Sequence, residues 1–84
     1  MEKILLIGGE GYIGNIVANY FLEKGYPVTS FDKLLYNNFR CVQNKEHFQN
    51  YQFVYGDILN TKILNPLIEK FEIVVQYANY NQKY

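Results

Sequence analysis

Four glycines lie close together near the start of the chain. In order they are Gly8, Gly9, Gly11 and Gly14. Their spacing satisfies both Gly-x-Gly-x-x-Gly and Gly-x-x-Gly-x-x-Gly, two forms of a loop that holds a diphosphate. Because it lacks a Cβ, Gly11 would let a pyrophosphate approach the main chain, and Gly14 would let a helix pack closely. The backbone N–H groups of Tyr12 and Ile13 would then face the phosphate oxygens from the positive end of that helix.

The segments on either side of the glycines are those that such a loop requires. The uncharged, branched run at 4–7 is typical of a buried parallel strand. Behind the glycines, apolar residues recur at the spacing of an amphipathic helix. They are Ile13, Ile16, Val17, Tyr20 and Phe21. A glycine turn that joins a strand to a helix and binds nothing fits the same pattern, so a second feature must decide.

That second feature is an acidic residue at the end of the next expected strand. The helix is expected to end at Gly25, which suits a left-handed cap. Asp32 follows the strand at 27–31, at about the 20-residue spacing where dinucleotide-binding folds place an acid for the ribose hydroxyls. A solvated turn residue or a helix cap is the alternative for Asp32. Its carboxylate would repel a 2′-phosphate and so favours NAD over NADP, a preference that Lys33 and Arg40 would weaken.

The pattern along the chain predicts an α/β domain with a partial Rossmann fold. We expect strands at 3–7, 27–31, 51–55 and 72–77. Helices are expected at 12–24, weakly at 40–48 and within 60–70. The alternation implies a parallel sheet of about four strands in the order 3-2-1-4, with flanking helices. A ligand crevice would then lie at the carboxyl ends of the first and fourth strands.

Pro66 leaves the last helix open to two interpretations. If Asn60 is the cap, Pro66 falls inside the helix and destabilises or kinks it. If Asn65 is the cap, Pro66 suits the first helical position, but little more than one turn of helix remains.

Size and composition restrict the class of protein. The 84 residues allow one small domain over 1–84, and eight basic and eight acidic residues cancel. This balance argues against binding to nucleic acid or to an anionic membrane. A lone cysteine, Cys41, fits a reducing cytosol. No apolar run approaches the roughly 20 residues of a membrane span, and the first strand begins too early for a signal peptide. We therefore expect a soluble, cytoplasmic protein.

Four segments resemble the N-terminal, NAD-binding part of NAD-dependent epimerases and dehydratases. These are extended short-chain dehydrogenase/reductases, most of which act on nucleotide sugars. Leu6–Gly14 resembles the family's VTGGxGFIG and Asp32–Tyr36 its DNLLY. Phe53–Asn60 resembles FVxGDIRD, and Val74–Asn79 resembles VVHLAA.

The resemblance implies roles for three further residues. Asp57 would accept a hydrogen bond from the adenine amino group, and the Ile58 N–H would donate to a ring nitrogen. The backbone around Ala78 would lie against the cofactor. The sequence departs from the family's fourth-strand segment, on the nicotinamide side of the cofactor, where Gln76, Tyr77 and Asn79 replace the usual types. Ile7 also replaces a Thr or Ser.

The resemblance does not extend to a catalytic group. In the family a Tyr-x-x-x-Lys pair and a Ser or Thr act far downstream of position 84. Tyr80 and Lys83 are one residue too close together and wrongly placed. His47 is expected to be solvated, and Cys41 has no base nearby to activate it. We predict no catalytic residue and no metal site.

The sequence favours the NAD-binding portion of a nucleotide-sugar epimerase or dehydratase, shortened and inactive alone. A non-catalytic nucleotide-binding or interaction subunit is the second hypothesis, and a degenerate relic is the third. The run Ile73–Val75 would form an open apolar edge. Self-association or a complementary C-terminal chain would cover that edge.

Overall fold

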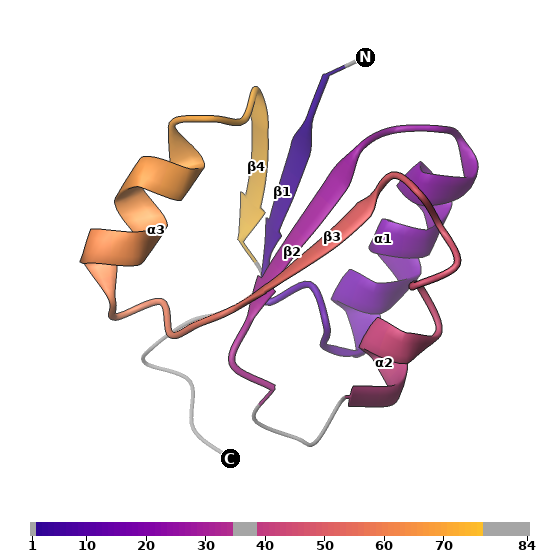
Figure 1. Cartoon of the computed structure of the whole chain (residues 1–84), viewed down its shortest axis with the longest axis horizontal. Coiled ribbons are helices and arrows are strands. Elements are labelled where there is room, and N and C mark those ends of the chain that lie inside the picture. The colour runs from indigo at the N-terminus through magenta and orange to yellow at the C-terminus, as the bar shows by residue number, and fades with distance from the viewer. Residues whose placement is uncertain (1, 35–38, 77–84) are drawn as a thin grey trace.

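The computed structural model describes residues 2–34 and 39–76, which form an α/β fold (Figure 1). The strands are β1 (Ile4–Ile7), β2 (Val28–Asp32), β3 (Tyr51–Tyr55) and β4 (Ile73–Gln76). The helices are α1 (Tyr12–Glu23), α2 (Phe39–Gln43) and α3 (Thr61–Ile68). All four strands therefore lie within one or two residues of their predicted positions, although Tyr77 lies outside the described residues.

The strands form one parallel sheet in the order β3-β2-β1-β4, as predicted. Ile4 of β1 is in register with Val28 on one side and with Ile73 on the other. Because every strand runs in the same direction, the carboxyl ends of the strands meet at one edge of the sheet. The glycine loop after β1 and the carboxylate that ends β2 are brought together there.

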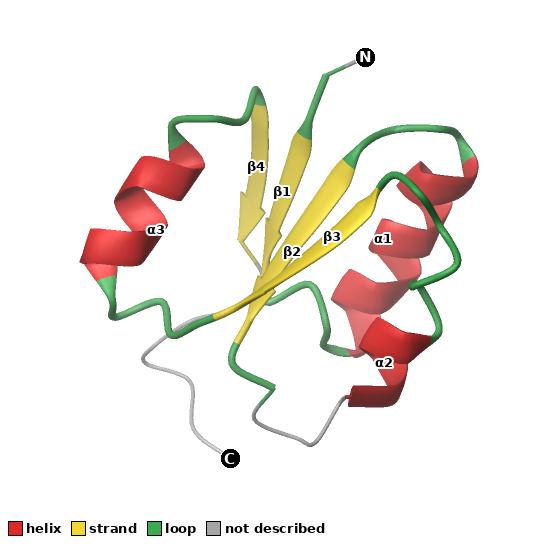
Figure 2. Ribbon diagram, in the orientation of Figure 1, coloured by secondary structure: helices red, strands yellow, loops and turns green. Residues whose placement is uncertain are grey.

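β1 is buried on both faces, which explains why its sequence is apolar without alternation. Ile4 and Leu6 pack in one cluster with Ala18 and Leu22 of α1. Leu5 and Ile7 pack in a second cluster that includes Leu64 of α3. Figure 2 shows the same division, with α1 and α2 on one side of the sheet and α3 on the other. These two clusters anchor β1, from which the glycine loop begins, on both faces of the sheet.

α1 ends as its sequence predicts, at a left-handed glycine. Gly25 has φ 90°, and its N–H donates to the Leu22 carbonyl at 3.0 Å. The Tyr26 N–H reaches the Phe21 carbonyl, also at 3.0 Å, and the two rings meet edge to face. This is the Schellman arrangement, in which carbonyls of the last helical turn gain backbone donors from beyond the helix.

The structure decides between the two interpretations of Pro66. α3 begins after Asn60, so Pro66 lies inside the helix, and a cap at Asn65 is wrong. The helix around Pro66 is retained because its apolar face packs on the sheet through Leu64 and, partly buried, Leu67. Tertiary burial thus outweighs the local penalty of the proline.

The weak helix expected at 40–48 is shorter in the structure, where α2 covers Phe39–Gln43. Beyond it, the Lys45 N–H donates to the Val42 carbonyl and the Phe48 N–H to the Lys45 carbonyl, each at 3.0 Å. These turns replace the helix. None of the helices in residues 2–34 and 39–76 has the length and apolar character of a membrane span.

Candidate functional site

The loop between β1 and α1 is a tight turn fixed by backbone bonds. The Gly8 N–H donates to the Phe31 carbonyl of β2 at 2.7 Å, and the Gly11 N–H turns back to the Gly8 carbonyl at 3.3 Å. Gly8 has φ 81°, in the left-handed region where side chains are disfavoured. The first glycine is therefore required by the fold itself.

Gly14 and Gly11 differ in what surrounds them. A Cβ on Gly14 would lie 2.8 Å from both the Gly8 carbonyl oxygen and the Gly9 Cα, so α1 packs too closely on the loop for any side chain. A Cβ on Gly11 would meet only the Gly8 oxygen, at 3.6 Å, an ordinary contact. Gly11 also has φ −75°, which any residue adopts. The fold requires glycine at position 14, whereas at position 11 a Cβ would fit without strain.

Among the residues that the structure describes, none accepts a hydrogen bond from the first N–H groups of α1. The first bond to an acceptor one turn back runs from the Asn15 N–H to the Gly11 carbonyl, at 2.9 Å. The N–H groups of Tyr12 and Ile13 precede that bond, and both residues are exposed. α1 has no side-chain cap bond and no acidic residue in its first turn. Its positive end is therefore not neutralised by the helix itself.

Asp32, the last residue of β2, faces the glycine loop. Its Oδ2 accepts a hydrogen bond from the Glu10 N–H, and its Oδ1 accepts one from the Leu34 N–H, each at 2.8 Å. An ionised carboxylate offers about four lone-pair sites, so positions remain for further donors. The structure thus brings the predicted carboxylate to the predicted loop.

Asp57 lies beyond the end of β3 and is paired with Lys33. The Lys33 Nζ donates to Asp57 Oδ2 at 2.9 Å, and the Leu59 N–H donates to Oδ1, also at 2.9 Å. These two donors, the Leu59 N–H first, hold the pKa of Asp57 below its ordinary value of 3.8. The same ion pair raises the pKa of Lys33. The Lys33 ammonium, which we expected to weaken the preference for NAD, is therefore paired with Asp57.

Two predicted cofactor-binding residues remain, Ile58 and Ala78. Ile58 is partly buried against the cluster under α3. Ala78 lies outside the described residues. The cofactor roles of these residues stay predictions.

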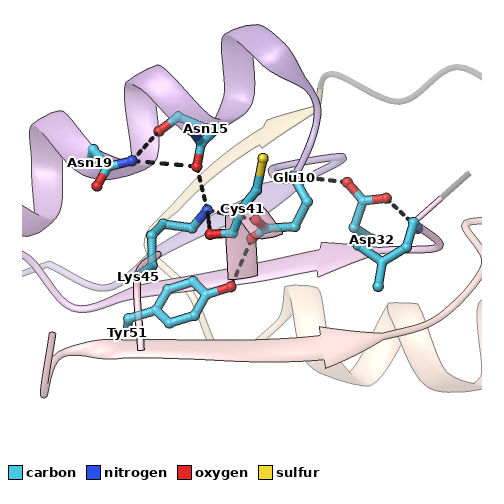
Figure 3. Close-up of polar contacts among 8 residues, drawn as sticks. Glu10, Asn15, Asn19, Asp32, Cys41, Lys45 and Tyr51 are labelled. Atoms are coloured by element: carbon cyan, nitrogen blue, oxygen red, sulfur yellow. Dashed lines mark hydrogen bonds and ion pairs between the residues drawn. The ribbon is translucent and has the colours of Figure 1, made fainter. Parts of the chain in front are cut away.

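A buried polar cluster beside the loop was missed by the sequence analysis. The Glu10 and Lys45 side chains are both fully buried, and the Lys45 Nζ lies 2.6 Å from Glu10 Oε1 (Figure 3). The Lys45 ammonium also donates to Asn15 Oδ1 and, at 2.7 Å, to the Cys41 carbonyl. The Tyr51 hydroxyl donates to Glu10 Oε2 at 2.8 Å. We call Glu10, Asn15, Lys45 and Tyr51 the Glu10 cluster.

The Glu10 cluster joins separate parts of the chain to the loop. Asn15 is in α1, Tyr51 begins β3, and Lys45 follows α2. Burial, and then the bond to Glu10, raise the pKa of Tyr51, so its phenol stays protonated and remains a donor. The only local signal in the sequence was a glutamate inside a glycine turn, directly behind a buried strand. Nothing in the sequence identified its partner.

Together, the sheet order, the glycine loop and the acid at the end of β2 define a partial Rossmann fold. The family model described as GDP-mannose 4,6 dehydratase matches residues 5–77 of the chain. The chain therefore belongs to this family, one of the NAD-dependent epimerases and dehydratases. This confirms the resemblance found in the sequence.

Known relatives agree with this assignment. The dTDP-D-glucose 4,6-dehydratase of Dictyostelium discoideum is 35% identical over 88 residues, which cover 95% of this chain and 20% of that protein. The Bordetella bronchiseptica enzyme WbmH, solved in complex with NAD+, is 30% identical with a TM-score of 0.83. It matches 100% of this chain and 27% of its own.

A third relative shows the same limited coverage. The UDP-Glc/GlcNAc 4-epimerase of Campylobacter jejuni is 26% identical, with a TM-score of 0.83 over 93% of this chain and 24% of its own. The chain thus spans about a fifth to a quarter of the length of these relatives.

Proposed function

We propose that the chain binds NAD at the carboxyl ends of the strands, in the crevice expected at β1 and β4, with the adenosine half reaching over β2. The pyrophosphate would lie on the glycine loop, against Gly8, Gly11 and Gly14. The N–H groups of Tyr12 and Ile13 would donate to its oxygens. The glycine at position 11 supports this role, because the loop itself would tolerate a Cβ there and does not require glycine.

The observation that best supports the proposal is the position of Asp32. Its carboxylate lies 2.8 Å from the main chain of the glycine loop, where the adenosine ribose of a bound dinucleotide would follow the pyrophosphate. A 2′-phosphate would meet this negative charge, so NAD is preferred to NADP. The presence of NAD+ in the WbmH structure supports the same cofactor.

The adenine would lie toward the end of β3. We propose that Asp57 accepts a hydrogen bond from the adenine amino group and that the Ile58 N–H donates to a ring nitrogen. The Lys33 ammonium occupies one Asp57 oxygen in the structure, and the Leu59 N–H occupies the other. Adenine would therefore share or displace the Lys33 contact. The backbone of Ala78 would complete the cofactor site.

We further propose that this unit is the NAD-binding portion of a nucleotide-sugar epimerase or dehydratase. Two of the relatives named above are such enzymes by name, and the chain covers 20% of the one and 24% of the other. In an oxidoreductase of this class NAD accepts a hydride from the substrate. We assign no catalytic residue within 1–84, so acid–base groups and the sugar site would have to come from other residues.

Calorimetric titration of the 84-residue chain with NAD, NADP and ADP-ribose tests the cofactor assignment. We expect heat with NAD and ADP-ribose, weaker binding of NADP, and a loss of NAD affinity in Asp32→Ala. Absence of heat and of any thermal shift with all three ligands would refute dinucleotide binding. An unchanged affinity in Asp32→Ala would refute the role of that carboxylate alone.

The edge of the sheet supports a second proposal, that the chain self-associates. Within the described residues, β4 pairs with β1 only, and Val74 is 39% exposed. An open apolar edge favours pairing with another strand. Sedimentation velocity should show a mass that rises with concentration, and Val74→Lys should reduce it. A monomer at all concentrations would contradict the proposal.

A further inference from the structure

The Glu10 carboxylate is unusual because it lies inside a loop that we propose holds a diphosphate. Glu10 stands between Gly9 and Gly11, and its side chain is fully buried. Water therefore cannot screen its charge as it would on the surface. An unpaired carboxylate at this position would repel the two negative charges of a pyrophosphate.

In the structure Lys45 compensates the charge of Glu10. Its ammonium lies 2.6 Å from Glu10 Oε1, and both side chains have no exposed surface. The pair has no net charge, so the groups of the loop that would contact a ligand are its backbone N–H donors. In the part of the chain that the structure describes, Lys45 is the one cation in contact with Glu10.

The contacts of Lys45 also fix where the compensating charge lies. The ammonium has three hydrogens, and three acceptors surround it: Glu10 Oε1, Asn15 Oδ1 and the Cys41 carbonyl. Asn15 belongs to the first turns of α1, whose N–H groups face the proposed phosphate site. The positive charge therefore lies beside the start of the helix, with all three of its hydrogens engaged (Figure 3).

We propose that Lys45 is a positioning residue for dinucleotide binding, which neutralises the Glu10 carboxylate so that the glycine loop accepts a diphosphate. This inference rests on the proposed function. It predicts an effect that depends on the charge of the ligand. A role in holding the loop's shape alone would affect charged and uncharged ligands alike.

The experiment compares ADP-ribose with adenosine, which lacks the diphosphate, by NMR titration of the 84-residue chain. Two unit charges roughly 10 Å apart, at an effective dielectric constant of about 20, change an affinity by about tenfold or more. In Lys45→Met we expect ADP-ribose affinity to fall by about this factor relative to adenosine. In Glu10→Gln, which leaves the ammonium uncompensated, the same ratio should shift several-fold toward ADP-ribose.

The double variant Glu10→Gln/Lys45→Met removes both charges and keeps similar shapes. Its ratio of ADP-ribose to adenosine affinity should return to within about threefold of the parent. Lys70→Met is the matched control, because it removes one exposed lysine that follows α3 in the sequence. It should leave the ratio unchanged. If Lys45→Met alone does not fold, the opposite shift in Glu10→Gln and the recovery in the double variant still test the proposal.

Three results would overturn the inference. The first is an equal loss of affinity for adenosine and ADP-ribose in Lys45→Met. The second is an unchanged ratio of ADP-ribose to adenosine affinity in Glu10→Gln, and the third is a double variant that binds ADP-ribose as weakly as Lys45→Met does. If the parent chain bound no ADP-ribose, the proposed function would fail and the inference with it. The parent titration therefore distinguishes the two failures.

Discussion

Replacing Asp32 by asparagine tests both the loop and the cofactor preference. In the structure each carboxylate oxygen accepts one N–H bond at 2.8 Å, from Glu10 and from Leu34. Asparagine has a single acceptor oxygen, so its amide nitrogen would face the other N–H as a second donor. Hydrogen bonds to charged groups contribute about 1.5–3 kcal/mol. We expect the free energy of unfolding to fall by about 2–3 kcal/mol.

Thermal unfolding followed by circular dichroism measures that loss. For a domain of this size, 1 kcal/mol corresponds to about 4–8 °C in Tm, so Asp32→Asn should lower Tm by on the order of 10–20 °C. A dinucleotide that binds the folded chain should recover part of this shift. An unchanged Tm would show that the two bonds to Asp32 do not stabilise the loop.

The same variant should change the cofactor preference, because asparagine does not repel a 2′-phosphate. Calorimetry at low salt should show the ratio of the NADP and NAD dissociation constants falling by about tenfold or more. Asp57→Asn is the control, since it removes the other carboxylate at this edge and should weaken both cofactors alike. An unchanged ratio in Asp32→Asn, or an equal change in Asp57→Asn, would refute our account of NAD selection.

Three further predictions follow from the same geometry. Gly14→Ala should lower the free energy of unfolding by about 1–3 kcal/mol, because its Cβ would lie 2.8 Å from the backbone of the loop. Gly11→Ala should unfold at the same urea concentration as the parent but bind NAD more weakly. Lys45→Met should lower the free energy of unfolding by about 3–5 kcal/mol by leaving Glu10 unpaired, and the double variant with Glu10→Gln should recover most of it. The pKa of Asp57 is lower in the folded chain than its ordinary value of 3.8, so its ion pair stabilises the fold fully at pH values above 3.8. This stabilisation is lost as the pH falls through the pKa of the folded chain, and the difference in Tm between the parent and Asp57→Asn should shrink over the same pH range.

Much of the fold follows from short-range patterns that the sequence states directly. Ile4–Ile7 is apolar at every position because β1 is covered on both faces, and the structure confirms this. The glycine at position 25 ends α1 because only glycine adopts its φ of 90° without strain. Right-handed crossovers restrict the orders open to four parallel strands, and the order expected for a dinucleotide-binding fold is the one observed.

The features that were not predictable depend on contacts distant in the sequence. The path of the chain around Pro66 was left undecided because the burial of Leu64 against Leu5 and Ile7 determines it. The length of α2 was overestimated because turns around Lys45 interrupt the pattern, and its side chain is buried against Glu10, 35 residues away. No periodicity in a single sequence indicates a pair of this kind.

Glu10 is held from two sides, at its backbone by Asp32 and at its side chain by the other members of the Glu10 cluster. The Glu10 N–H is bound by Asp32, and the Glu10 carboxylate is bound by Lys45 and Tyr51. A substitution of Lys45 that moved the loop would therefore also move Asp32. It would weaken the binding of every ligand that contains a ribose, adenosine included. A change that only exposed a charge would spare adenosine. The difference between these two ligands thus separates a loop held in shape from a loop held neutral, and the burial of both charged groups leads us to expect the second.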